Sequence, residues 1–154
     1  MPRDAPEVMA LYAPFIREAD GPLEYDRDGA GVDIEAEIAA GPPPDLVAPG
    51  GVFLLARVDG EPAGIGGVRH LDTEVAEVKS MFVSPAHRGI GLGRQILAEL
   101  DRIAAEHGCR AVRLDSSAYL TAALRLYRAA GYRDVPAYND NPKADVWFER
   151  SLTG

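Results

Sequence analysis

The pattern of apolar and polar residues predicts two amphipathic helices before any strand. In the first, over 7–18, apolar residues recur at helical spacing, and a Gly-Pro pair at 21–22 ends it. The second is a short helix over 33–39, which a Gly-Pro-Pro-Pro run at 41–44 terminates because such a run is incompatible with a helix. The polar segment 23–31 between them is expected to be a loop.

β-branched and aromatic residues then indicate a sheet. Three strands joined by tight turns are expected over 52–58, 62–70 and 75–83. The Asp59-Gly60 pair is a hairpin signal, so the first two strands should be antiparallel. Three glycines within the second strand indicate a bulge or a close approach of another backbone or side chain. The sequence therefore predicts an antiparallel meander.

Helices and strands alternate in the last third of the chain. The expected elements are a helix over 92–106, a strand over 109–116, a helix over 120–130 and strands over 132–135 and 145–152. A full helix joins the strands 75–83 and 109–116, so these should run parallel in a right-handed βαβ unit. The order predicts an α/β (α+β) fold with a mixed central sheet and helices on both faces, built as a single domain over residues 1–154.

Composition and charge narrow the classes of function. The chain has 154 residues, of which 47% are hydrophobic and 26% charged, which is ordinary for a soluble globular domain. A net charge of −8 argues against nucleic acid or an anionic membrane as the main partner. There is no apolar run of about 20 residues and no secretory signal. A single cysteine, Cys109, fits a reducing compartment, so we expect a cytoplasmic protein. The three histidines form no metal-ligand pattern, so no metal is expected.

The candidate chemistry lies between the strand 75–83 and the helix that follows it. Three alternate glycines from Gly89 to Gly93 permit close backbone approach to a ligand, and Arg88 and Arg94 flank them as donors suited to phosphate oxygens. The unpaired N–H groups of the first helical turn, together with the helix dipole, favour an anion at the same place. The sequence therefore predicts a pyrophosphate cradle.

The segment can be compared with the sequence patterns of three families of phosphate-binding loop. A P-loop requires Gly-Lys-Ser/Thr, whereas the chain has Gly-Arg-Gln at 93–95. A dinucleotide loop requires Gly-x-Gly-x-x-Gly, which the glycine spacing does not match, although Asp115 lies about where a ribose-binding acid would be expected. The third pattern, Arg/Gln-x-x-Gly-x-Gly/Ala, fits Arg88–Gly93 at every fixed position. With the surrounding run MFVSPAHRGIGLGRQIL, the chain resembles the GCN5-related N-acetyltransferase (GNAT) superfamily. Its tail segments LYRAAGY, PAYNDNP and WFERSL resemble uncharacterised bacterial members.

This resemblance implies an acetyl-coenzyme A-dependent N-acetyltransferase that transfers acetyl directly to a primary amine of a small molecule or amino terminus in a ternary complex. The region from Leu23 to Gly51 would close over the acceptor, and relatives are often homodimers. The two parallel strands would splay to admit the pantetheine arm. The implied acetyl-coenzyme A contacts are Met81, Phe82 and Val83 for pantetheine and Arg88, Gly89, Ile90, Gly91, Leu92, Gly93 and Arg94 for pyrophosphate.

The resemblance also suggests catalytic residues. Tyr127, protonated at neutral pH, would act as general acid toward the departing thiolate, although a core tyrosine is the alternative. Glu77 would act as general base, with a surface ion pair to Lys79 as the competing interpretation, and His70 or a water as other bases. Cys109 is expected to be a buried core residue and not an acyl carrier.

One position departs from the family pattern, and two other functions remain open. Leu120 stands where many members carry a pantetheine-binding asparagine, so Ser116 or Ser117 would have to take its place. One alternative function is a non-catalytic module that binds acyl-coenzyme A. The other is a nucleotide-binding protein in which Asp115 contacts a ribose, and it predicts an all-parallel sheet.

Overall fold

The structure, a computed structural model, describes residues 1–23 and 29–152. Its elements follow the predicted order and are α1 (Pro6–Ala19), α2 (Ile34–Ala40), β1 (Gly51–Val58), β2 (Glu61–His70), β3 (Val75–Val83), the 3-10 helix η1 (Pro85–His87), α3 (Leu92–Glu106), β4 (Ala111–Ser116), α4 (Thr121–Ala129), β5 (Arg133–Asp134) and β6 (Val146–Ser151). Bounds differ from prediction by at most two residues. Of the predicted acceptor region, residues 24–28 lie outside the described residues.

The strands form one mixed six-stranded sheet in the order β1-β2-β3-β4-β6-β5. The first three are antiparallel neighbours, and β3 pairs with β4 in parallel. The hairpin between β1 and β2 turns at Asp59 and Gly60, whose φ angles of 51° and 81° match the type of turn that the sequence signals. The predicted mixed sheet is confirmed. The all-parallel sheet of the nucleotide-binding alternative is wrong.

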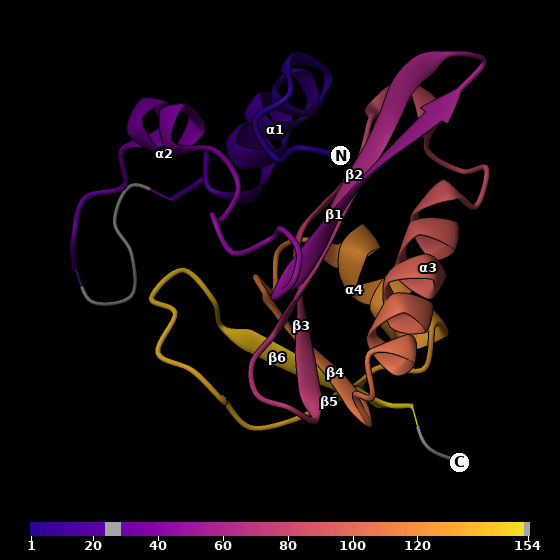
Figure 1. The fold of residues 1–154 in the computed structure, drawn as a ribbon. Helices are drawn as coiled ribbons and strands as arrows, with labels where there is room; N and C mark the ends of the chain where they lie inside the picture. The colour runs from indigo at the N-terminus through magenta and orange to yellow at the C-terminus, as the bar shows by residue number, and fades with distance from the viewer. Residues whose placement is uncertain (24–28, 153–154) are drawn as a thin grey trace.

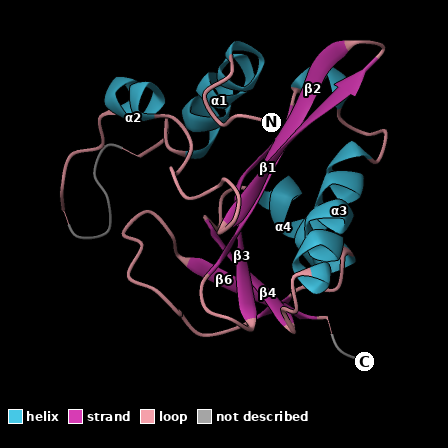
Figure 2. Ribbon diagram, viewed as in Figure 1, coloured by secondary structure: helices cyan, strands magenta, loops and turns pink. Residues whose placement is uncertain are grey.

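Helices cover both faces of the sheet, as Figure 1 shows. One apolar cluster joins α3 and α4 to the sheet and contains Leu97, Leu100 and Phe148. The other joins α1 to the opposite face around Val8, Phe53 and other buried residues. The long loop between β5 and β6 lies on the same side of the sheet as α1 and α2 (Figure 2).

The glycines of β2 mark a close approach, as predicted. A Cβ atom on Gly66 would lie 2.9 Å from Ile96 Cγ2 and 3.1 Å from Leu100 Cδ1, so α3 packs directly on the strand backbone. The pairing of β2 with β3 also shifts register next to Gly66, and Ser80 on β3 has a φ of 56°. A β-bulge therefore distorts β3 shortly before its end.

The parallel strands β3 and β4 separate after a short paired stretch. Their pairing covers only Val75 with Ala111, Ala76 with Val112 and Glu77 with Arg113, although β3 continues to Val83 and β4 to Ser116. Within the described chain, the second half of β3 thus has a partner strand on its β2 side alone. This is the splay that the family resemblance implies, and it opens the sheet where the predicted site lies.

Candidate active site

A cavity of about 950 Å³ lies at the splayed ends of β3 and β4. Residues of α1, β3, the loop before α3, the end of β4 and α4 all line it. Each predicted coenzyme-binding residue except Ile90, which is 59% exposed, is among them. The cavity therefore connects the predicted pyrophosphate loop with the open edge of β3.

The loop ahead of α3 has the backbone of an anion site. Gly89 and Gly91 have φ angles of 83° and 81°, which other residues rarely adopt, and Gly91 is the N-cap of α3. No side chain caps the helix, so its first N–H groups stay available to a ligand. His87 Nδ1 is buried there without a hydrogen-bond partner in the described chain. These features are suited to phosphate oxygens.

The two arginines of the loop point to different parts of the molecule. Arg88 Nη2 lies 2.6 Å from Glu18 Oε2 at the end of α1, while Arg88 Nε donates to the Val83 carbonyl at 3.0 Å. Arg94 extends toward the end of α4, with its Nη2 3.5 Å from the Ala129 carbonyl oxygen. Arg88 is thus already paired with a carboxylate, and an incoming pyrophosphate would compete with Glu18 for it.

Tyr127 projects from α4 into the cavity with 7% of its surface exposed. Burial and the negative charge of Asp115 raise the pKa of its phenol to about 12. Its hydroxyl makes no hydrogen bond to another residue in the described part of the chain. Tyr127 is consequently a protonated donor whose hydroxyl is free to bind a ligand.

Glu77 does not line the cavity, and its side chain is only 1% exposed. Arg69 donates twice to Oε1, and Tyr138 and Asn139 donate to Oε2. Lys79 Nζ is 3.8 Å away, so the predicted pairing exists but is buried, and its interpretation as a surface ion pair is wrong. Both carboxylate oxygens of Glu77 are occupied by protein donors.

The carboxylate that reaches the cavity beside β3 is Asp115, at the end of β4. Lys79 Nζ is 3.3 Å from both of its oxygens, and Asn139 Nδ2 donates to Oδ2 at 2.8 Å. The sequence indicates Asp115 only as a ribose ligand, and Lys79 only as a partner of Glu77. The missed signal was the place of Asp115 near the end of β4, where ligands of α/β sheets gather, with Lys79 on the parallel strand beside it.

The far end of the cavity is bounded by α1, α2 and the loop before β6. Lys143 Nζ lies 3.5 Å from Asp20 and also pairs with Glu37. Tyr119 donates a hydrogen bond from its hydroxyl to the Ala19 carbonyl. Burial raises the pKa of Asp20, which the Lys143 cation partly offsets. The C-terminus of α1 is therefore tied to loops on the other side of the opening.

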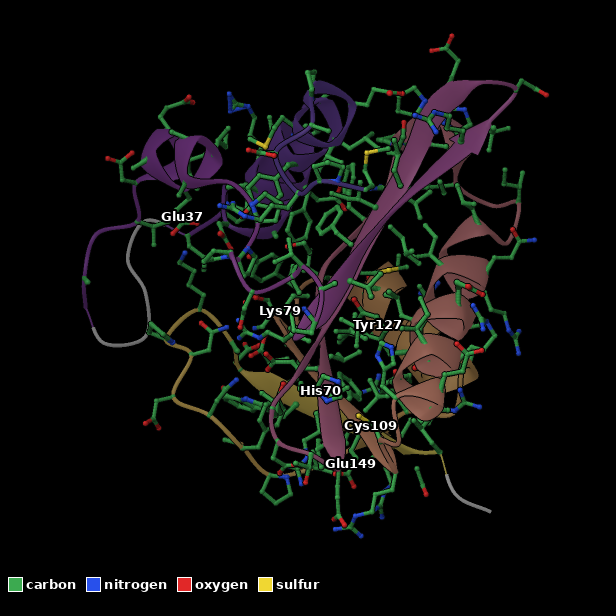
Figure 3. The ribbon with its side chains drawn as sticks, viewed as in Figure 1. Glu37, His70, Lys79, Cys109, Tyr127 and Glu149 are labelled. Carbon is green, nitrogen blue, oxygen red and sulfur yellow. The ribbon has the colours of Figure 1, made fainter. Side chains whose placement is uncertain are left out.

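Other predicted candidates lie elsewhere. His70 does not line the cavity, and its Nδ1 is 3.5 Å from Cys109 Sγ, with the His107 ring stacked nearby. Cys109 is buried, and burial raises the pKa of its thiol. In the view of Figure 3, His70 and Cys109 lie close to Glu149 and far from Glu37. Lys79 and Tyr127 lie between Glu37 and these residues. Ser116, Ser117 and Leu120 line the cavity, but the Ser117 hydroxyl donates to the Lys143 carbonyl.

A sheet split between two parallel strands, with a glycine-rich anion loop at one end of the opening, defines the class of acyl-coenzyme A-binding acetyltransferases. The Acetyltransferase (GNAT) family model matches residues 7–132, so the chain belongs to this family. Members of the family use acetyl-coenzyme A to acetylate amines.

Two relatives and one solved structure illustrate the similarity. The IAA acetyltransferase of Azospirillum brasilense is 38% identical over 84 residues, 53% of this chain and 54% of that protein. An uncharacterised N-acetyltransferase of Schizosaccharomyces pombe is 26% identical over 152 residues, 97% of this chain and 89% of that protein. PaiA N-acetyltransferase of Thermoplasma acidophilum, solved with coenzyme A, superposes with a TM-score of 0.72 at 14% identity over 95% of this chain and 91% of that one.

The chain spans about half the length of some curated relatives that it matches, since the alignments with the Azospirillum protein and with an Escherichia coli N-acetyltransferase each cover 54% of that relative. Among the described residues, no helix is long and apolar enough to cross a membrane.

Proposed function

We propose that the protein is an acetyl-coenzyme A-dependent N-acetyltransferase that transfers acetyl directly to a primary amine. The observation that carries this proposal is the cavity at the split between β3 and β4, which joins the pyrophosphate loop to Tyr127 and Asp115. A donor arm laid along the open edge of β3 brings its thioester between these two side chains. Holding donor and acceptor in one cavity supplies the proximity on which such a transfer depends.

In the proposed reaction, the amine attacks the thioester carbonyl and Tyr127 donates its proton to the departing sulfur. The raised phenol pKa of about 12 keeps this proton in place at neutral pH. Direct transfer is favoured because Cys109 does not line the cavity, which leaves no thiol there to carry acetyl. That Glu77 acts as general base remains a prediction. Because Glu77 does not line the cavity, a proton from the acceptor would have to reach it through other residues.

The competing function is a module that binds acyl-coenzyme A without turnover. It shares the donor loop but makes the Tyr127 hydroxyl dispensable. The free hydroxyl of Tyr127 and the carboxylate beside it favour the enzyme, since a binding module needs neither an acid nor a base at the thioester.

Isothermal titration with acetyl-coenzyme A, coenzyme A and NAD tests the donor. We expect binding of both coenzyme A forms with micromolar Kd and weaker binding in Arg88→Ala. Thiol release is then measured with a polyamine, an aminoglycoside, a free amino acid and a peptide amino terminus. Binding without thiol release in any of them would favour the module, and tight binding of NAD alone would overturn the donor assignment.

A further inference from the structure

Asp115 and Lys79 face each other at the point where β3 and β4 begin to separate. The last paired residues are Glu77 and Arg113, and each member of the pair lies two residues further along its strand, on the same face of the sheet. The ammonium of Lys79 is 3.3 Å from both Asp115 oxygens, and both residues line the cavity. The pair therefore marks the apex of the split, which a donor arm entering between the strands would approach.

The Asp115 carboxylate is held in one orientation and still has room for a ligand. Its side chain is 7% exposed, and Asn139, which itself accepts a hydrogen bond from Trp147 Nε1 at 2.9 Å, donates to Oδ2. Oδ1 has Lys79 as its protein partner in the described chain. A carboxylate oxygen accepts more than one hydrogen bond, so Oδ1 has capacity for a further donor.

We propose that Asp115 binds the ammonium group of the acceptor and takes its proton, with Lys79 as the positioning cation. This inference rests on the proposed acetyltransferase function. The ammonium gives one proton to Asp115, and the resulting amine forms a bond from nitrogen to the thioester carbon. As the carbon–sulfur bond breaks, the sulfur takes a proton from Tyr127, which recovers one from the amide nitrogen. The products are the amide, the coenzyme thiol and one proton that Asp115 passes to water.

Lys79 holds the Asp115 carboxylate in position and places a like charge beside the bound ammonium. A neighbouring cation disfavours the charged form of an amine and lowers its pKa, so the amine loses its proton more readily next to Lys79. The other titratable or charged groups packed around the pair are Glu77 on β3, Arg113 on β4, Arg69 on β2, Tyr127 on α4 and Tyr138 in the loop before β6. Of these, Tyr127 lines the cavity with Asp115 and Lys79.

Glu77 has a different place in the same network. It shares the amide of Asn139 with Asp115, at 3.4 Å and 2.8 Å respectively, and it holds Tyr138 by a hydrogen bond of 2.5 Å. Its role in this proposal is to fix the loop that orients Asp115. Glu77 is thus a positioning residue, and its loss should affect the reaction through geometry and not through protonation of the acceptor.

The test compares Asp115→Asn with Glu77→Gln over a range of pH, using the amine of the panel above that is acetylated fastest. We expect Asp115→Asn to lower kcat/KM for the amine about 100-fold at pH 7. This loss should shrink about tenfold for each unit of rising pH, because more acceptor then arrives already neutral. Lys79→Met should move the acidic limb of the wild-type profile to higher pH. Glu77→Gln should lower kcat/KM by about tenfold or less without changing the profile.

Coenzyme A binding separates this inference from the proposed function. The Kd measured by titration should stay within about twofold of wild type in Asp115→Asn, since the pair lies away from the pyrophosphate loop. Asp134→Asn, which removes an exposed carboxylate paired with Arg128, is the matched control and should change nothing. Unchanged kcat/KM in Asp115→Asn, or a pH-dependent loss in Glu77→Gln instead, would overturn the inference and leave the function intact. Wild type that turns over no amine would overturn both.

Discussion

Tyr127 combines a buried ring with a hydroxyl that points into the cavity, and this makes its role testable by removing one atom. We expect Tyr127→Phe to lower kcat about 100-fold while the Kd for coenzyme A changes little, because in the proposed reaction the phenol acts only on the departing thiolate. Since burial and Asp115 raise its pKa to about 12, ionisation of Tyr127 should cause no loss of activity below about pH 11. Steady-state kinetics from about pH 6 to 11 measures kcat and its pH dependence, and titration calorimetry measures the Kd.

Tyr132→Phe is the matched control for this substitution. The two rings are neighbours, with centroids 6.3 Å apart, but the Tyr132 hydroxyl donates to buried Asp101 at 2.5 Å and does not line the cavity. Its removal should cost about 1–3 kcal/mol of stability in urea denaturation, because Asp101 loses a buried donor, and kcat should stay near wild type. The opposite pattern would assign Tyr127 to the core.

For individual side chains, the sequence predicts which of them share a face of a strand but not which of them reach a ligand. The period of two correctly places Glu77 and Lys79 together on β3. Whether Glu77 or Asp115 reaches the cavity depends on where β3 and β4 stop pairing, and that is a property of two strands 36 residues apart. The glycine-rich loop before α3 was predictable because the residues that form it are adjacent in the sequence.

Among the elements, α1 is connected through Glu18 to the glycine-rich loop before α3. Its carboxylate lies 2.6 Å from Arg88 Nη2, where the predicted pyrophosphate would bind. Glu18→Gln should therefore tighten coenzyme A binding, by roughly two- to fivefold given that the pair is partly exposed. Titration calorimetry in low salt measures this change. The effect should vanish in an Arg88→Ala background, and with pantetheine, which lacks the pyrophosphate.

Glu7→Gln provides a comparison on the same helix. Glu7 forms an exposed ion pair with Arg57, with oxygen and nitrogen 2.8 Å apart, and does not line the cavity. We expect no change in coenzyme A affinity in this variant. Equal tightening in both variants would indicate a general effect of removing negative charge, and it would exclude specific competition for Arg88.

Helices and strands were predicted more accurately than side-chain contacts or the assembly of the cavity, because each is encoded by a local sequence pattern. The helix 92–106 and the strand 75–83 have the predicted bounds. The predicted bounds of the last strands were less accurate. β5 contains only Arg133–Asp134, because a strand this short carries too few residues to show a clear alternating pattern. No hydrophobic pattern in the sequence indicates the 3-10 turn at Pro85–His87 or the splay after Glu77. The splay was expected only from the family resemblance.

Across the whole molecule, the two faces of the sheet contribute different parts of the cavity. The α3 and α4 face supplies the anion loop and Tyr127, while the α1 face supplies Glu18, Asp20 and the loop that carries Lys143. The sequence could not predict this meeting, because it requires α1, β4 and the loop before β6 to converge on one opening. Contacts of Glu18, Ala19 and Asp20 connect the end of α1 to three other loops around that opening.

A ligand that bridges both faces should stabilise the fold as a unit. A ligand that binds only the folded state at a hundredfold above its Kd adds about 2.7 kcal/mol, which corresponds to a rise in Tm of roughly 5–10 °C for a domain of this size. We expect coenzyme A to produce such a rise in differential scanning fluorimetry. Pantetheine at equal concentration should produce less, because it leaves the first turn of α3 and Arg88 without an anion. Equal shifts for both ligands would place the binding energy in the split of the sheet and not in the glycine-rich loop.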